Sequence, residues 1–304
     1  MCGRYILAQQ AKFERELRLG RIDWSFSARY NVAPSQSVPV VRVSEGIHAG
    51  VMMRWGLIPF FAHGVPPRYA TINASIERLQ SAPAWRGPCE RGQRCIQVAA
   101  GFYEWHLEAN GHKQPYFIHL TDHEVFGFPG LWDRSIAADG TVIDSCALVT
   151  LPANELLRDI HNTGAHPGRM PAILAPADFD LWLEGSAPQA RAALRAYPAR
   201  RMAAYRVSTR VNSPKTEGAG LIEPARGDEP SALHLLRPVT LGSPPARCGR
   251  RGAPSTEPLV EQLAPPVHAE AATDGAQHER GAETHVCPDP PADRAEHYRA
   301  DEGE

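Results

Sequence analysis

Residues 94–105 read Arg94-Cys95-Ile96-Gln97-Val98-Ala99-Ala100-Gly101-Phe102-Tyr103-Glu104-Trp105. The first half is an apolar run typical of a strand, and it continues directly into an aromatic segment around a single glutamate. Further short β-rich runs lie on either side, separated by turn sequences such as Asn110-Gly111 and Asp139-Gly140. Because such turns join antiparallel strands into hairpins, the pattern predicts a mostly antiparallel arrangement.

The remaining elements are predicted from the same signals. Other strands are expected at residues 3–7, 37–43, 51–59, 115–120, 125–128, 130–132, 145–150, 169–174 and 205–211. Helices are expected at residues 9–19, 75–80, 152–160, 176–183 and 188–195, and residues 82–92 read as a loop. Short strands mixed with a few helices predict an α+β fold.

Composition changes near residue 225. All six Trp and all nine Phe precede it, and the last 80 residues hold 11 of the 28 Pro and no Phe, Trp or Ile. We therefore expect one domain over residues 2–224 and a disordered tail over 225–304. The tail holds 8 basic and 14 acidic residues, which leaves the domain with 24 basic and 20 acidic residues. This mild positive balance suits a polyanionic partner without requiring one.

The six cysteines, at positions 2, 89, 95, 146, 248 and 287, include no CxxC pair and no Cys/His cluster at zinc spacing. Neither disulfides nor a metal site is expected. No apolar run reaches the roughly 18 residues of a membrane span, and no signal-peptide pattern opens the chain. We expect a cytoplasmic or nucleoid-associated protein with reduced thiols and no cofactor.

The chain begins Met1-Cys2-Gly3-Arg4-Tyr5. Removal of Met1 before this small residue would leave Cys2 with a free amine and a thiol on adjacent carbons. An aldehyde could form a Schiff base with the amine, and the thiol could then close a thiazolidine ring in an intramolecular step. The alternative is an ordinary residue near a frayed terminus.

Four interior residues are candidates for the chemistry. Glu104 lies among aromatic residues, where burial would raise its pKa and make it a usable acid or base; alternatively it is a solvated glutamate. His161 could move protons near neutral pH or simply cap a helix, and His166 competes for the same role. Asn73 could orient an amine, a sugar or a phosphate, or satisfy a loop backbone.

Arginines interleave with aromatic residues in a way that suits single-stranded nucleic acid, whose phosphates meet cations and whose bases stack on rings. The candidates for contact with DNA are Arg4, Trp55 and Arg169, together with Asn73. The alternative is that the aromatic residues belong to the core and the arginines are solvated.

Taken together, the motifs resemble those of one family, and they occur in its order. They are Met1–Tyr5, Arg29–Pro34, Trp55–Pro59, Ile72–Ala74, Arg94–Ile96, Gly101–Trp105, Gln114–Phe117, Gly130–Trp132, Ile160-His161 with Arg169-Met170-Pro171, and Leu221–Pro224. The chain resembles the SOS-response-associated peptidase family, the abasic-site shield proteins, over about residues 2–224.

The resemblance implies a compact domain with a curved, mostly antiparallel β core flanked by helices, and a groove for single-stranded DNA. It further implies that Cys2 captures the aldehyde of an abasic site as a thiazolidine crosslink. By the same correspondence Glu104 would transfer protons and assist the autoproteolytic exposure of Cys2, Asn73 would position the sugar and amine, and His161 would assist Schiff-base chemistry and its reversal.

The chain departs from the family pattern at three places. Ser75 stands where an arginine usually contacts phosphate, which predicts weaker DNA affinity. Gln97 adds a polar residue to an apolar strand, and residues 162–168 form a longer link before Arg169 than the family has. Two other functions remain open: an N-terminal-nucleophile amidohydrolase, and a single-stranded DNA-binding paralogue that forms no crosslink.

Overall fold

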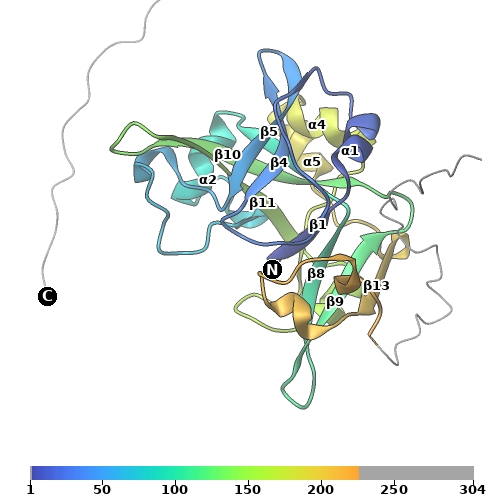
Figure 1. The fold of residues 1–304 in the computed structure, drawn as a ribbon. Coiled ribbons are helices and arrows are strands. Elements are labelled where there is room, and N and C mark those ends of the chain that lie inside the picture. Colours follow the sequence, from blue (N-terminus) through green and yellow to red (C-terminus); the bar gives the residue numbers. More distant parts are fainter. Residues whose placement is uncertain (1, 226–304) are drawn as a thin grey trace, which may run out of the picture. The chain divides into compact units, whose positions relative to one another are not determined.

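The computed structural model describes residues 2–225, and two β-sheets form the centre of this part (Figure 1). A five-stranded sheet has the order β13-β9-β8-β1-β3, and every neighbouring pair in it is antiparallel. An eight-stranded sheet follows the path β12-β11-β10-β7-β4-β5-β2, with β6 added to β11. Its parallel pairs are β2 with β5, β5 with β11 and β6 with β11. The predicted α+β class and mostly antiparallel arrangement are confirmed.

The strands are β1 (Arg4–Leu7), β2 (Arg21–Ile22), β3 (Arg29–Val32), β4 (Ser37–Ser44), β5 (Ile47–Trp55), β6 (Asn73–Ser75), β7 (Arg94–Ala99), β8 (Gly101–Leu107), β9 (Lys113–Leu120), β10 (Phe126–Ile136), β11 (Val142–Pro152), β12 (Arg169–Pro171) and β13 (Met202–Arg206). The α-helices are α1 (Gln10–Glu16), α2 (Pro83–Glu90), α3 (Glu155–Ile160), α4 (Phe179–Leu183) and α5 (Ala187–Ala193).

The eight-stranded sheet curves until it closes on itself. Strand β11 pairs with β10 over residues 142–148 and also with β5, where Arg54 lies opposite Ser145 and Trp55 opposite Cys146. Strands β11, β10, β7, β4 and β5 therefore form a closed ring, which removes two exposed sheet edges. The predicted curvature of the β core is confirmed.

The two sheets are joined by the segment that contains β7 and β8. Strand β7 lies in the ring, and after Ala100 the chain enters the five-stranded sheet as β8. Gly101 makes this crossing possible, because a Cβ there would lie 2.5 Å from the ring of Phe117. The core lies where the sheets meet: the Tyr5 and Trp55 rings are 5.4 Å apart, and those of Phe102 and Phe128 are 5.9 Å apart.

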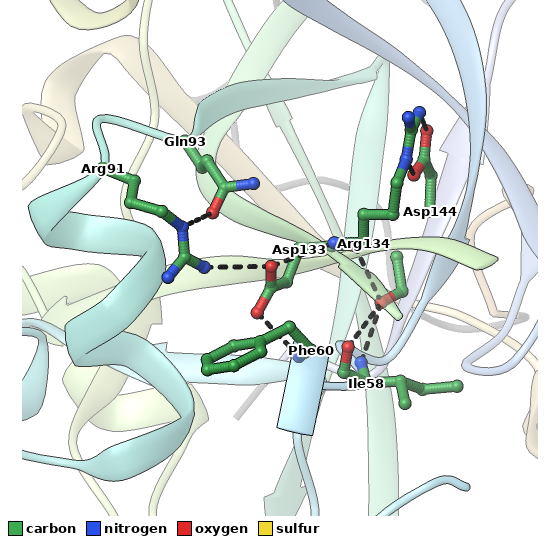
Figure 2. Close-up of polar contacts among 8 residues, drawn as sticks. Ile58, Phe60, Arg91, Gln93, Asp133, Arg134 and Asp144 are labelled. Atoms are coloured by element: carbon green, nitrogen blue, oxygen red, sulfur yellow. Dashed lines mark hydrogen bonds and ion pairs between the residues drawn. The ribbon is translucent and has the colours of Figure 1, made fainter. Parts of the chain in front are cut away.

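Buried polar groups hold the loop that connects β5 to β6 (Figure 2). The Phe60 N–H donates to the Asp133 carboxylate at 3.0 Å, and Arg91 donates to its other oxygen at 3.0 Å. The Ile58 N–H donates to the Ser145 hydroxyl at 2.7 Å. Asp133 and Ser145 lie on the ring strands β10 and β11, so the loop is fixed to the rigid part of the fold before it reaches Asn73.

The prediction of a loop over residues 82–92 is wrong, because Pro83–Glu90 form α2. Pro83 suits the first helical turn, but Pro88 lies inside the helix, where it supplies no N–H. Burial of Trp85 and Pro88 against the neighbouring strand outweighs this loss.

Several other boundaries also differ from the predictions. The first helix is shorter than expected, residues 76–78 form only a 3-10 turn, and residues 126–136 form one strand instead of two. The strand predicted at 169–174 ends at Pro171, and the one predicted at 205–211 is replaced by β13 and a 3-10 turn at Thr209–Asn212. The predicted tail lies outside the described residues apart from Ala225. No helix in the described part of the chain is both long and apolar enough to cross a bilayer.

Candidate active site

Cys2 reaches the interior through the pairing of β1 with β8. Arg4 lies opposite Tyr103 and Tyr5 opposite Phe102, so the residues that precede Arg4 run alongside Glu104. Both Cys2 and Glu104 are buried, with exposed fractions of 0% and 2%. The Cys2 thiol donates to the carbonyl of Arg4 at 3.6 Å. Cys2 is thus part of the core.

Burial determines the protonation states of Cys2 and Glu104. Desolvation raises the pKa of Glu104 to about 7, although the positive charge of the N-terminal amine acts against this. Burial also raises the pKa of the Cys2 thiol well above its usual range, and the Glu104 charge adds to the effect. At neutral pH the thiol is therefore protonated, while Glu104 is divided between its acid and its carboxylate and can accept or return a proton.

Asn73 holds the N-terminal segment from the other sheet. It lies on β6, which pairs in parallel with β11. Its Nδ2 donates to the carbonyl of Cys2 at 3.0 Å. Its Oδ1 is buried and accepts no hydrogen bond from the described residues, which leaves an acceptor beside Cys2 for an amine or a hydroxyl group.

His161 contributes a neutral imidazole. It ends α3, and its Nδ1 accepts a hydrogen bond from the backbone N–H of Arg169 at 3.1 Å. The proton of the neutral ring is therefore on Nε2. Burial, followed by the positive charges of the N-terminal amine and Arg169, lowers the pKa of His161 to about 4. The ring offers an N–H donor at neutral pH and carries no charge.

Two separate hollows border these residues. A groove of about 1020 Å³ is lined by residues that include Asn73, Ser75, His166 and Arg169. A smaller hollow of about 400 Å³ is lined by Glu104, Trp105, Lys113, His161, Thr163, Gly164 and Asn212. The segment between His161 and Arg169 contributes to both hollows. The structure thus places His161 with Glu104 and places His166 in the groove.

Of the four residues proposed to contact DNA, Asn73 and Arg169 line the groove. Trp55 is fully buried, and its indole N–H donates to the carbonyl of Ile72 at 3.1 Å. It belongs to the core and has no face on which a base could stack, so this assignment is corrected. Its contact with Ile72 instead supports the strand that carries Asn73.

Arg4 also has a structural role. Its guanidinium donates to the Asn31 side chain at 2.9 Å and to the backbone carbonyls of Val211 and Asn212 at 2.6 and 3.2 Å. These contacts hold the C-terminal part of the domain against β1 and β3. These three hydrogen bonds give Arg4 a structural role, and a contact of Arg4 with DNA stays a prediction.

Sequence reasoning missed further residues that line the groove, among them Glu77, Arg78 and Tyr69. Glu77 pairs with Arg169, but the two are 92 residues apart and nothing local signals their contact. Tyr69 is 56% exposed at the end of a proline-rich loop that offers no periodic pattern. Its exposed aromatic side chain is apparent only once the loop is folded. Among residues 2–225, no group of three His, Cys, Asp or Glu side chains could hold a metal ion.

Residues 1–214 match the model of the family described as SOS response associated peptidase (SRAP). The chain belongs to the SRAP family. One SRAP relative is the abasic site processing protein YoqW of Bacillus subtilis, which is 35% identical over 73% of this chain and 99% of its own length. Another is the abasic site processing protein HMCES of Gallus gallus, 29% identical over 76% of this chain and 73% of its own length.

Two solved structures have a similar fold. A protein from Bordetella bronchiseptica has a TM-score of 0.60 and 28% identity, over 68% of this chain and 100% of its own. A protein from Bacteroides thetaiotaomicron has a TM-score of 0.64 over 74% of this chain and 100% of its own. Its 24% identity is evidence for a shared SRAP fold alone.

Proposed function

We propose that this protein binds single-stranded DNA and captures abasic sites covalently through Cys2, which shields the damaged strand. Family membership and the names of its relatives support abasic DNA as the substrate. The main support for this chemistry is that the Cys2 thiol is buried beside Glu104, whose carboxyl group has a pKa of about 7. A protonated thiol needs a base of this strength close by.

The reaction begins with hydrolysis of the Met1–Cys2 peptide bond, which frees the α-amine of Cys2. The amine nitrogen adds to the C1′ aldehyde of the ring-opened abasic sugar, and loss of one water gives an imine. The thiol sulfur then bonds to the same carbon, and its proton passes to the nitrogen. The product is a five-membered thiazolidine, whose closure benefits from the intramolecular arrangement of the two groups.

Each neighbouring residue has a role that its protonation allows. The Glu104 carboxylate takes the thiol proton and returns it to the nitrogen. Asn73 fixes the Cys2 carbonyl and offers Oδ1 to the reacting amine or sugar. His161 supplies a neutral N–H that can hydrogen-bond the hydroxyl group which leaves as water.

The test is to incubate the purified protein with a single strand that carries one abasic site and to run a heated denaturing gel. We expect a heat-stable shifted band for the wild type and none for Cys2→Ala, because an amine without the thiol forms only a hydrolysable imine. An intact strand of the same sequence is the control.

A wild type that lacks Met1 and gives no band would contradict the proposal. Glutamate and ammonia release from glutamine would then favour an amidohydrolase, and strand binding without an adduct would favour a non-crosslinking paralogue. Membership in the SRAP family supports neither of these alternatives.

A further inference from the structure

The groove beside Asn73 contains a guanidinium group that already has an anionic partner. Arg169 and Glu77 form a two-pronged ion pair, with Nη1–Oε1 and Nη2–Oε2 distances of 2.6 and 3.0 Å. This parallel fork is the geometry in which an arginine side chain also binds a phosphate group. In the free protein, a carboxylate therefore occupies the face of Arg169 that could bind phosphate.

Glu77 stands on the solvent side of this pair. Its side chain is 51% exposed, whereas that of Arg169 is 14% exposed and also donates to the carbonyl of Thr150 at 2.8 Å. The Ser75 hydroxyl donates to the same carboxylate and keeps it in place. The hydrogen bonds from Arg169 lower the pKa of Glu77 to about 2, so the carboxylate stays charged at working pH. An anion that enters the groove must therefore compete with Glu77.

Ser75 sharpens this competition. An arginine at position 75 would add a second cation beside the carboxylate, but serine adds only a hydroxyl group. The cluster of Ser75, Glu77 and Arg169 thus carries no net charge. Of the two arginines that line the groove, Arg78 and Arg169, the pair with Glu77 neutralises one. The groove therefore attracts a polyanion less strongly, because affinity for nucleic acid depends on the number of phosphates that the protein neutralises.

We propose that Glu77 is an internal counter-anion: it occupies the phosphate-binding face of Arg169 until a backbone phosphate displaces it. The inference rests on the proposed function, since it assigns the phosphate to a strand held in this groove. The consequence is selectivity for abasic over intact strands. An intact strand is held weakly and leaves, whereas a strand with an abasic site is retained by the covalent bond to Cys2.

The experiment measures binding of the full chain to a labelled intact single strand over a series of salt concentrations. Glu77→Gln preserves the shape of the side chain and removes its charge. We expect at least about fivefold tighter binding at low salt and a salt slope steeper by about 0.7, the value for one additional phosphate contact on a single strand. Glu45→Gln is the matched control, because it breaks a surface pair with Arg21 at the turn between β4 and β5 and changes net charge equally.

A double-mutant cycle tests whether Glu77→Gln changes DNA binding through Arg169. In an Arg169→Gln background, Glu77→Gln should no longer tighten binding, because the phosphate-binding face is gone. If Glu77 only props Arg169 in position, then Glu77→Gln weakens binding to the level of Arg169→Gln, and the inference is overturned. Unchanged binding, or equal tightening by Glu45→Gln, overturns it too.

Adduct formation with an abasic strand separates this inference from the proposed function. Failure of the wild type to form a heat-stable adduct rejects the proposed function, whatever the binding data show. If all variants form adducts but Glu77→Gln does not bind intact DNA more tightly, only the counter-anion role of Glu77 is rejected. Thermal unfolding of each variant confirms that the compared proteins are folded.

Discussion

At the residue scale, the site holds two titratable groups whose pKa values are moved in opposite directions by burial. Glu104 is raised to about 7 and His161 is lowered to about 4. Near neutral pH the carboxyl group can therefore exchange a proton, while the imidazole stays neutral. This separation of pKa values supports the proposal that Glu104 has the acid–base role and His161 a hydrogen-bonding role.

The raised pKa of Glu104 predicts a stability penalty. Between pH 4.5 and pH 7 the folded protein keeps a proton that the unfolded chain releases, so stability falls as pH rises through this window. Glu104→Gln removes the dependence. We expect the variant to be more stable than the wild type above pH 7, by on the order of 3 kcal/mol, and to show no such gain near pH 4.

Thermal or urea unfolding between pH 4 and pH 8 measures this difference. His161 contributes a slope of opposite sign, but it is present in both proteins and cancels in the difference. Glu16→Gln, at the exposed end of α1, is the control and should follow the wild type. A constant difference between Glu104→Gln and the wild type across the pH range would contradict the prediction.

Ser75 gives a second prediction at this scale. Ser75→Arg gives the cluster with Glu77 and Arg169 a net positive charge. We expect about tenfold tighter binding of single-stranded DNA at low salt and a steeper salt dependence. Ser37→Arg places the same charge at an exposed position on β4 and should have a smaller effect. Equal affinities and slopes for Ser75→Arg and the wild type would refute the prediction.

At the element scale, the loop between β5 and β6 determines where Asn73 lies. It has no regular hydrogen-bonded partner strand over residues 56–72, and buried side chains of β10 and β11 hold its backbone. Asp133 is the centre of this network, because it accepts from Phe60 and Arg91 and is 2% exposed (Figure 2). The position of Asn73 therefore depends on a carboxylate far from it in sequence.

Asp133→Ala should destabilise the domain by about 2–3 kcal/mol, because it removes a buried carboxylate and leaves the Phe60 N–H without its acceptor. The Arg91 guanidinium is 44% exposed and can bind water instead, so it adds little to this cost. Asp144 provides a matched comparison on the next strand. It pairs with Arg134 at 2.7 and 2.8 Å but is 20% exposed, so Asp144→Ala should cost only about 1 kcal/mol. Urea unfolding measures the free energy of unfolding lost in each variant. Equal losses would show that burial of the carboxylate does not determine the loss.

At the scale of the whole molecule, the last described residues complete the five-stranded sheet. Leu221 is buried, the Tyr205 hydroxyl donates to the carbonyl of Ile222 at 2.7 Å, and Ala225 donates to the carbonyl of Arg206 at 2.9 Å. These contacts lie beyond residue 214, where the match to the family model ends. We propose that the folded domain extends to about residue 224.

Two truncations test this boundary. A chain that stops after Ala225 should unfold at the same temperature as the full chain and form adducts at the same rate. A chain that stops after Glu217 loses the burial of Leu221 and should be less stable by at least about 2 kcal/mol. Calorimetry decides the outcome, and an unchanged midpoint for the shorter chain would contradict the proposed boundary.

The hairpin turns and apolar runs of the sequence determined the α+β class, since turn chemistry and strand propensity act over a few residues. The motifs around Cys2, Asn73, Glu104 and His161 identified the family and proposed the site. The tertiary structure decided which residues face it. Trp55 is directed into the core and Arg4 onto backbone carbonyls, and Arg169 pairs with a glutamate 92 residues away. These outcomes depend on the closure of the ring and the packing of two sheets, which are long-range contacts that no local pattern encodes.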